Sequence, residues 1–344
     1  MTRTMRAALF HEHGGPEVIR IEQVPVPEPG QGEVRLRVEA AALNHLDLWV
    51  RRGLPIETTM PHIGGSDVAG RIDAVGPGVP DLDASARYVV DPSIGCGVCE
   101  WCTRDEVPLC VRYRILGEHT NGGFAEYVVV PAGNLYAVPD TLPLPEAAAA
   151  PLATLTAYRA LTTRGRLQPG ESVLITGASG GVATAAIQIA KHIGARVYAV
   201  TTAQHADRVR ALGADVVYDR SQVDFSREVW KDTGKRGVDV ILDSVGEAFA
   251  QQNVRALTRG GRLVVYGATT GPHAQLDLRV VFWKQVEILG STMATPSEFR
   301  AAMDLVVTRA VRPVVDRVMS LDDATAAHER LEAGEAFGKI VLQP

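Results

Sequence analysis

The sequence lacks long apolar runs and an excess of basic charge, and its cysteines are confined to one short segment. The first two absences each exclude a class of protein. No run approaches the roughly 18 consecutive apolar residues that a membrane helix needs, and the opening segment MTRTMRAALFHEHGG has no apolar stretch long enough for a signal peptide. The net charge of −5 offers no basic surplus for nucleic acid or an anionic membrane. We therefore expect a cytoplasmic protein that acts on a small molecule and binds neither nucleic acid nor membrane.

The composition is that of an ordinary globular protein, and the predicted secondary structure changes near residue 150. Hydrophobic residues are 46% and charged residues 22% of the 344 residues, which excludes a disordered or fibrous chain, and the length suggests about two domains. Short β-like runs punctuated by proline and glycine fill residues 1–150. From residue 171, apolar strand-like runs such as ESVLIT, ARVYAVTT and VDVILDSV alternate with helical segments. This alternation predicts an α/β domain with a parallel sheet covered on both faces.

A glycine-rich turn joins the first of these strands to the first helix in VLITGASGGVATAAIQIAK. Ala178, Gly180 and Ala183 fit a dinucleotide fingerprint, with Gly181 and Val182 between them. Small residues let the backbone approach a pyrophosphate, and the helix amino end supplies free N–H groups and partial positive charge. A plain packing turn is the alternative, but the strand–turn–helix context favours a bound dinucleotide.

The end of the second strand indicates which nicotinamide is bound. An acid there would bind the ribose 2′-hydroxyl of NAD and repel a 2′-phosphate. The segment VTTAQH has none, while Thr201, Thr202, Arg208 and Arg220 could supply donors and charge. We therefore predict NADP(H) rather than NAD(H), although both arginines could simply be solvated surface charges.

All four cysteines fall in one stretch as Cys96, Cys99, Cys102 and Cys110, with the spacing C-x2-C-x2-C-x7-C. A reducing compartment disfavours disulfides, so the cluster predicts a metal site. Four thiolates suit a closed, structural zinc site, and an iron–sulfur cluster is the alternative that spacing leaves open.

Taken together, these motifs resemble the medium-chain dehydrogenase/reductase superfamily along essentially the whole chain. The cysteine stretch resembles the structural zinc lobe of its zinc alcohol dehydrogenases, here residues 96–110. The segments AALNHLD, GSDVAGRIDAVG and GGRLVVYGATTG resemble its quinone oxidoreductase branch. The resemblance implies a mostly β GroES-like catalytic domain (1–152 plus 295–344) into which a Rossmann domain (153–294) is inserted.

The chain departs from the zinc alcohol dehydrogenases at the catalytic zinc. Where they carry Cys, His and Cys as ligands, the resemblance places Asn44, Ser66 and Leu152. These residues cannot form the nitrogen and sulfur shell of zinc. A metal site rebuilt from the nearby histidines 45, 62 and 119 is the alternative.

The resemblance also suggests residues that carry the chemistry. Asn44, Asp47 and Ser66 are the catalytic candidates, although asparagine and aspartate often cap local backbone instead. The strand VEILGST lies where these proteins extend their sheets across a dimer interface, so we expect a homodimer or higher homo-oligomer. The further cofactor-binding candidates are His45, Thr156, Asp243, Gly267, Ala268 and Thr269.

Without a catalytic zinc, nothing polarises an alcohol oxygen, whereas an electron-poor alkene or quinone needs less help to accept hydride. The sequence therefore predicts an NADPH-dependent reductase of quinones or α,β-unsaturated carbonyl compounds with one structural zinc. Two alternatives remain at this point. One is a zinc-type alcohol dehydrogenase acting on alcohols or aldehydes, and the other is a non-catalytic NADPH-binding sensor.

Overall fold

The computed structural model describes residues 3–344, and Met1 and Thr2 of the predicted catalytic domain lie outside the described residues. The chain divides into two compact units. The first comprises Met1–Leu152, Ala294–Arg309 and Pro313–Pro344, and the second comprises Ala153–Met293 and Ala310–Arg312. Each unit has its own buried apolar cluster, so each can be described by itself.

The first unit is mostly β, as its proline- and glycine-punctuated sequence predicts. Its main sheet has the order β10-β6-β5-β3-β18-β17, with β9 also pairing with β3, and a smaller sheet has the order β2-β1-β4. The main-sheet strands are β3 (Glu33–Ala42), β5 (Asp67–Val75), β6 (Arg87–Val90), β9 (Tyr127–Pro131), β10 (Leu135–Val138), β17 (Val315–Ser320) and β18 (Lys339–Gln343). The smaller-sheet strands are β1 (Thr4–Phe10), β2 (Arg20–Pro25) and β4 (His62–Ile63), and the short pair β7 (Ser93–Ile94) and β8 (Arg114–Ile115) stands apart.

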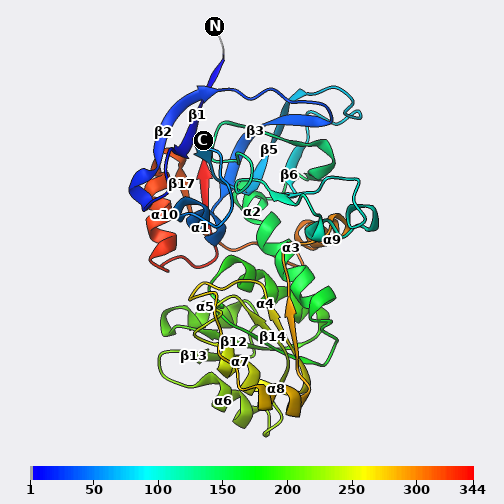
Figure 1. The fold of residues 1–344 in the computed structure, drawn as a ribbon, viewed down its shortest axis with the longest axis vertical. Helices are drawn as coiled ribbons and strands as arrows, with labels where there is room; N and C mark the ends of the chain where they lie inside the picture. Colours follow the sequence, from blue (N-terminus) through cyan, green and yellow to red (C-terminus); the bar gives the residue numbers. More distant parts are fainter. Residues whose placement is uncertain (1–2) are drawn as a thin grey trace. The chain divides into compact units, whose positions relative to one another are not determined.

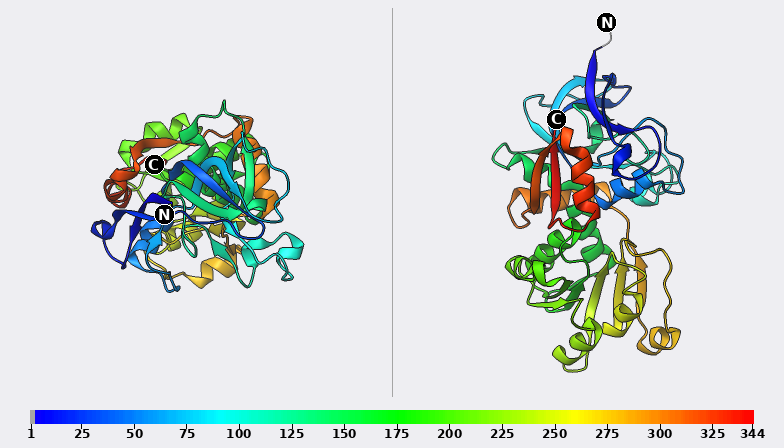
Figure 2. Two further views of the ribbon diagram at one scale, coloured as in Figure 1. Left: turned by 90° about the horizontal axis from the view of Figure 1, so that it is seen from above. Right: turned by 90° about the vertical axis from the view of Figure 1, so that its left-hand side faces the viewer.

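The two ends of the chain build this unit together. Strand β18 pairs antiparallel with β3, with Val341 opposite Ala42 and Leu342 opposite Ala41. Figures 1 and 2 show the red C-terminal strands and helix α10 (Ala324–Glu332) beside the blue N-terminal strands. The remaining helices of the unit are α1 (His45–Arg52), α2 (Leu144–Ala149), α9 (Pro296–Val307) and the start of α3 (Pro151–Arg159). Residues 339–344 are thus brought next to residues 41–44, where the candidate site lies.

The second unit is a six-stranded parallel sheet of order β13-β12-β11-β14-β15-β16 with flanking helices (Figure 1). The order reverses between β12-β11 and β14, the switch point at which doubly wound sheets bind dinucleotides. The strands are β11 (Ser172–Ile175), β12 (Arg196–Thr201), β13 (Val216–Asp219), β14 (Val238–Asp243), β15 (Leu257–Val265) and β16 (Glu287–Gly290). The helices are α4 (Gly181–Ile193), α5 (Ala206–Ala211), α6 (Phe225–Asp232), α7 (Ala250–Ala256) and α8 (Leu278–Lys284).

The predicted fold class, a Rossmann sheet inserted into a mostly β domain, is confirmed. The strands expected in residues 171–292 form, and the predicted helix after the glycine-rich turn ends at Ile193 with Gly194 in the left-handed conformation (φ 93°). None of the helices in residues 3–344 combines the length and apolar character that crossing a membrane requires.

Candidate functional site

A buried carboxylate fixes the start of helix α1, which carries three of the predicted site residues. Oδ2 of Asp47 accepts the N–H of Asn44 at 2.7 Å, and Oδ1 accepts the N–H of Gly65 at 2.9 Å. Burial raises the pKa of Asp47 to about 6, while the two backbone donors oppose that rise. Asp47 therefore ties residues 44 and 65 together, and the capping role that asparagine and aspartate often play is present here. His45 is the first residue of α1 and is exposed.

A buried ion pair adjoins Asn44 and Leu152, two of the three positions that the resemblance assigns to the catalytic-zinc ligands. Asp67 is fully buried and Lys339 is 4% exposed, and Nζ of Lys339 lies 2.7 Å from Oδ2 of Asp67. The same oxygen accepts Nδ2 of Asn44 at 3.0 Å, and Oδ1 of Asp67 accepts the N–H of Leu152 at 2.7 Å. Lys339 also donates to Oδ1 of Asn44. The lysine ammonium thus contacts Asn44 and Asp67, and Asp67 in turn holds the backbone of Leu152.

Next to this pair, the Ser66 side chain is fully buried, and its hydroxyl has no hydrogen-bond partner among the described residues. An unpaired buried hydroxyl costs free energy unless a ligand completes it. Asn44, by contrast, directs its amide nitrogen to Asp67 and, at 3.5 Å, to the carbonyl of Ala42. The Ser66 hydroxyl is therefore free to donate to a ligand.

The segment after β8 lies directly against this cluster. Gly122, Gly123 and Phe124 donate their N–H groups to the carbonyls of residues 63, 65 and 64 at 2.7, 2.8 and 3.0 Å. Gly117 packs so closely on Gly65 that a Cβ there would lie 2.7 Å from backbone atoms. Glu118 follows at 8% exposure, and burial together with the charge of Asp47 raises its pKa to about 7.

The donor set of this cluster does not suit zinc, because Asn44, Ser66 and Leu152 offer an amide, a hydroxyl and an alkyl group in place of thiolate or imidazole. The Asp67 carboxylate is already paired with Lys339. In residues 3–344 the four cysteines are the one group of three or more histidine, cysteine or acidic side chains close enough to hold a metal. Two of the three histidines considered from the sequence already bond to the backbone. Nε2 of His62 bonds the carbonyl of Gly117 at 3.0 Å, and Nδ1 of His119 accepts the N–H of Ile115 at 3.2 Å. The structure thus gives no support to a metal site rebuilt from histidines.

The glycine-rich turn in the second unit has the shape a dinucleotide needs. It follows β11, Gly177 takes the left-handed conformation (φ 58°), and Gly180 caps α4. The first intrahelical bond comes from Thr184 to the carbonyl of Gly180 at 2.9 Å. The N–H groups of Gly181, Val182 and Ala183 precede that bond and are thus available to an anion. A Cβ on Gly180 would meet a single atom within 4 Å, the carbonyl oxygen of Gly177 at 3.5 Å, so the space above the turn is open.

Three of the predicted 2′-phosphate residues, Thr201, Thr202 and Arg220, lie at the carboxyl end of β12. Thr201 pairs with Asp219 across β12 and β13, and the N–H of Arg220 donates to the carbonyl of Thr201 at 2.9 Å. The hydroxyl of Thr202 is buried without a hydrogen-bond partner in the described chain. Arg208 lies on α5, which follows this strand, and both arginines are exposed.

The other cofactor-binding candidates lie at the next strand ends of the same sheet. Asp243, the last residue of β14, accepts the hydroxyl of Thr176 at 2.6 Å and the N–H of Gly246 at 2.9 Å, so it closes a strand-terminating turn. The loop of Gly267, Ala268 and Thr269 follows β15, and the N–H of Thr269 bonds the carbonyl of residue 244 at 3.0 Å. Thr156 lies on α3, and its buried hydroxyl has no partner in residues 3–344.

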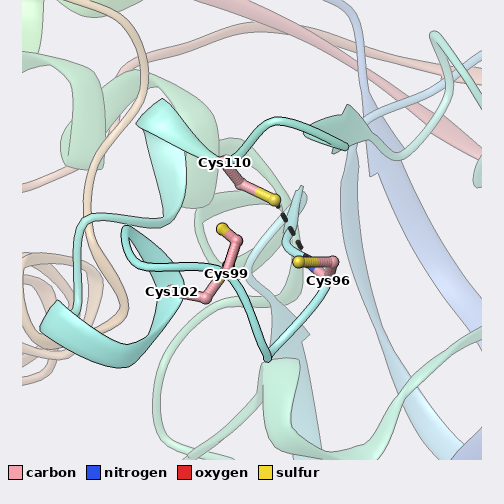
Figure 3. A group of neighbouring side chains, drawn as sticks. All are labelled: Cys96, Cys99, Cys102 and Cys110. Atoms are coloured by element: carbon pink, nitrogen blue, oxygen red, sulfur yellow. Dashed lines mark hydrogen bonds between the residues drawn. The ribbon is translucent and has the colours of Figure 1, made fainter.

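The four cysteines point toward one another in a lobe of loops and short helical turns (Figure 3). Their sulfur atoms all lie within 4.8 Å of one another, a spacing compatible with Zn–S bonds of about 2.3 Å. The N–H groups of Cys96 and Arg112 each donate to Sγ of Cys110 at 3.3 Å. A hydrogen bond from the backbone of Val98 lowers the pKa of Cys96 to about 5. Burial raises the pKa of Cys102 to about 11, so it is the spacing of the four sulfur atoms that fits a tetrahedral metal ion.

Comparison with known proteins identifies the family and supports the fold. Residues 30–140 match the alcohol dehydrogenase GroES-like domain, and residues 181–308 match the zinc-binding dehydrogenase family. An NAD-dependent alcohol dehydrogenase of Sulfolobus acidocaldarius is 35% identical over 98% of this chain and 99% of its own length. The chain belongs to the medium-chain dehydrogenase/reductase superfamily.

Relatives within the superfamily have several activities. An acryloyl-coenzyme A reductase of Sulfurisphaera tokodaii is 31% identical, covering 94% of this chain and 96% of its own. The human quinone oxidoreductase is 29% identical, covering 99% and 98%. A crystal structure of an NAD-dependent alcohol dehydrogenase superposes with a TM-score of 0.95 at 43% identity, covering 99% of this chain and 100% of that one. A crotonyl-CoA carboxylase/reductase solved with NADP superposes with a TM-score of 0.92 at 28% identity, covering 99% and 95%. The chain is thus an NAD(P)-dependent oxidoreductase of this superfamily.

Sequence reasoning missed Lys339, Asp67 and Glu118. Lys339 carries one sequence signal, because it opens the otherwise apolar run GKIVLQP in a chain with only five lysines. Asp67 sits beside the flagged Ser66 in GGSDVAG, but nothing in the sequence indicates its partner 272 residues away. Glu118 owes its environment to the packing of Gly117 on Gly65, which no local pattern signals.

Proposed function

We propose that this superfamily member is an NADPH-dependent reductase of α,β-unsaturated carbonyl compounds or quinones, which transfers hydride without a catalytic zinc and carries one structural zinc in its cysteine lobe. The observation that carries the proposal is the Asp67–Lys339 ion pair. Asn44 and Leu152 both bond Asp67, so the Lys339 ammonium lies beside positions that the resemblance assigns to the catalytic-zinc ligands. A bound zinc would compete with that ammonium for the same oxygen atoms.

Hydride addition to an electron-poor alkene or quinone places negative charge on the acceptor oxygen, and preorganised donors lower the cost of that charge. The Ser66 hydroxyl has a free donor, and the Lys339 ammonium holds its charge nearby with two of its three hydrogens engaged. Asn44 and Asp47 instead position other groups of the site. Asn44 holds the Lys339 ammonium, and Asp47 holds the start of α1.

The cofactor, when bound, supplies the hydride, and the second unit supplies its site. The N–H groups at the start of α4 suit a pyrophosphate, and the edge with Thr201, Thr202, Arg208 and Arg220 suits a 2′-phosphate. The relative solved with NADP has the same fold and supports this preference, whereas relatives named as NAD-dependent favour the alternative.

One assay distinguishes the proposed reductase from an alcohol dehydrogenase and from a non-catalytic sensor. The oxidation of NADPH is followed with a panel of enones, enals, enoyl thioesters and quinones, then repeated with NADH, and alcohols are tested with the oxidised cofactors. We expect turnover of a panel member with a preference for NADPH. Alcohol-dependent reduction of NAD(P)⁺ alone would favour an alcohol dehydrogenase, and tight NADPH binding without any turnover would favour a sensor.

We also propose that two copies associate through the edge of the parallel sheet. Strand β16 pairs with β15 on one side and has no strand on the other within the described chain. Beside it lie exposed apolar side chains of α8 and β16, namely Leu278, Phe282, Trp283 and Ile288. An unpaired strand edge next to exposed apolar residues suits pairing with a second copy.

A further inference from the structure

We propose that Glu118 is the general acid that protonates the α-carbon of the reduced alkene, an assignment that rests on the proposed reductase function. It names a proton donor, which neither the sequence motifs nor the names of the relatives supply.

The position of Glu118 follows from backbone packing. The segment 117–124 is held on residues 63–65 by three hydrogen bonds of 2.7 to 3.0 Å and by the close fit of Gly117 on Gly65. Gly65 in turn donates to Asp47 and precedes Ser66. The backbone beside Glu118 is therefore held on the segment that leads into Ser66 and Asp67, and the charge of Asp47 acts on the Glu118 carboxyl. The 8% exposure of Glu118 leaves a route to water.

Asp47 and Glu118 are both buried carboxyl groups, but their hydrogen-bond partners differ, so one favours the ionised form and the other the protonated form. Asp47 accepts two backbone N–H groups, which stabilise its ionised form. The Glu118 carboxyl accepts no hydrogen bond from residues 3–344, and its nearest basic atom, Nδ1 of His119 at 3.6 Å, already accepts a backbone N–H. Burial and the charge of Asp47 raise the pKa of Glu118 to about 7. Glu118 thus retains its proton to near neutral pH, as a general acid must.

The other charged or titratable groups around Glu118 do not take over this role. His62 is bonded to the carbonyl of Gly117, and burial lowers its pKa, so it is neutral. Lys339 and Asp67 are paired with each other. The charged or titratable groups of this cluster and of the adjoining segments are Asp47 on α1, His62 on β4, Asp67 on β5, Arg114 on β8, Lys339 on β18 and His119 in the same loop as Glu118.

Hydride from the reduced nicotinamide forms a C–H bond at the β-carbon, and the alkene π pair moves toward the carbonyl to give an enolate. The enolate α-carbon then takes the proton of Glu118, whose O–H bond breaks. The carboxylate recovers its proton from water, so that one NADPH and one proton are consumed for each alkene reduced.

The test uses an α-methyl enone or enoyl thioester, because protonation at its α-carbon creates a stereocentre. The full-length wild type is compared with Glu118→Gln, which keeps the shape but has no acidic proton, and Glu118→Asp, which keeps the acid on a shorter stem. Glu126→Gln is the matched control in the same segment, since that carboxylate accepts the N–H of Arg6 at 2.8 Å outside the cluster. Thermal unfolding and NADPH affinity verify that each variant is folded.

We expect the wild type to give one α-enantiomer and a rate that falls above a pH of about 7. Glu118→Gln should lower the rate about 100-fold, lose that pH limb and give a nearly racemic α-centre, whereas Glu118→Asp should recover the selectivity in part. In the cofactor-free protein, infrared difference spectra should show a protonated carboxyl band at neutral pH that is absent from Glu118→Gln. Unchanged selectivity and pH profile in Glu118→Gln would overturn the assignment alone. Absence of turnover by the wild type would overturn the proposed function and this assignment with it.

Discussion

Lys339 is the residue on which the account of the site depends most. Its ammonium neutralises a fully buried carboxylate and holds Asn44. Removing one partner of a buried pair leaves the other charge uncompensated. The replacement of both partners by neutral groups avoids that cost.

We therefore expect Lys339→Met to lower the free energy of unfolding by about 3–5 kcal/mol, and the double variant Lys339→Met/Asp67→Asn to recover most of it. Denaturant unfolding of the four proteins of this cycle measures the coupling. Lys191→Met is the control, because its ion pair with Asp215 is partly exposed and should be worth under about 1 kcal/mol. A loss for Lys339→Met no larger than the control would contradict a charge-neutralising role.

Asp91 is a second buried carboxyl with a perturbed proton affinity. It is 3% exposed, and burial raises its pKa to about 7 although the N–H of Ser93 donates to it at 2.9 Å. Between its unfolded and folded pKa values, the folded state binds more protons than the unfolded state, so stability falls as the pH rises.

Unfolding free energy measured from pH 5 to 8 should accordingly fall less in Asp91→Asn than in the wild type, with a difference of about 2 kcal/mol across that range. Asp83→Asn is the comparison, because hydrogen bonds from Ser85 lower the pKa of Asp83 and keep it ionised throughout. Parallel pH profiles for the wild type and Asp91→Asn would show that Asp91 ionises normally.

At the scale of elements, the turn between β11 and α4 is the feature that most determines cofactor binding. A Cβ on Gly180 makes an ordinary contact of 3.5 Å with Gly177, so the fold tolerates alanine there. The same Cβ would enter the space through which a pyrophosphate approaches the helix N–H groups. We expect Gly180→Ala to leave the melting temperature nearly unchanged and to weaken NADPH binding about tenfold, or ~1.4 kcal/mol, as measured by calorimetry. Gly133→Ala, which adds a Cβ into open space in the first unit, should change neither quantity.

The elements themselves were largely predictable, because they depend on local patterns. The parallel strands and the helix opened by Gly180 and closed by Gly194 follow from apolar periodicity and cap residues. The catalytic-zinc positions 44, 66 and 152 could be identified only through the family resemblance. The ion pair beside them could not be predicted, since Lys339 reaches Asp67 only when β18 pairs with β3.

At the scale of the whole molecule, the proposed assembly rests on the free edge of β16. Ile288 lies on this strand at 46% exposure, and Trp283 at the end of α8 is 69% exposed. A charge on an edge strand opposes pairing with another strand. We predict that Ile288→Lys shifts the protein from dimer to monomer in analytical ultracentrifugation. Trp230→Lys, which changes an equally exposed residue on α6, should leave the assembly intact; a wild type that is itself monomeric would refute the proposal.

The most direct test of the central claim is a zinc titration of the active protein, in which metal content and the rate of enone reduction by NADPH are measured on the same samples. We predict one tightly held zinc per chain, lost when Cys102 is replaced by serine, and a reduction rate that does not rise when more zinc is added. A second tightly bound zinc whose removal abolishes hydride transfer, and whose return restores it, would contradict the account.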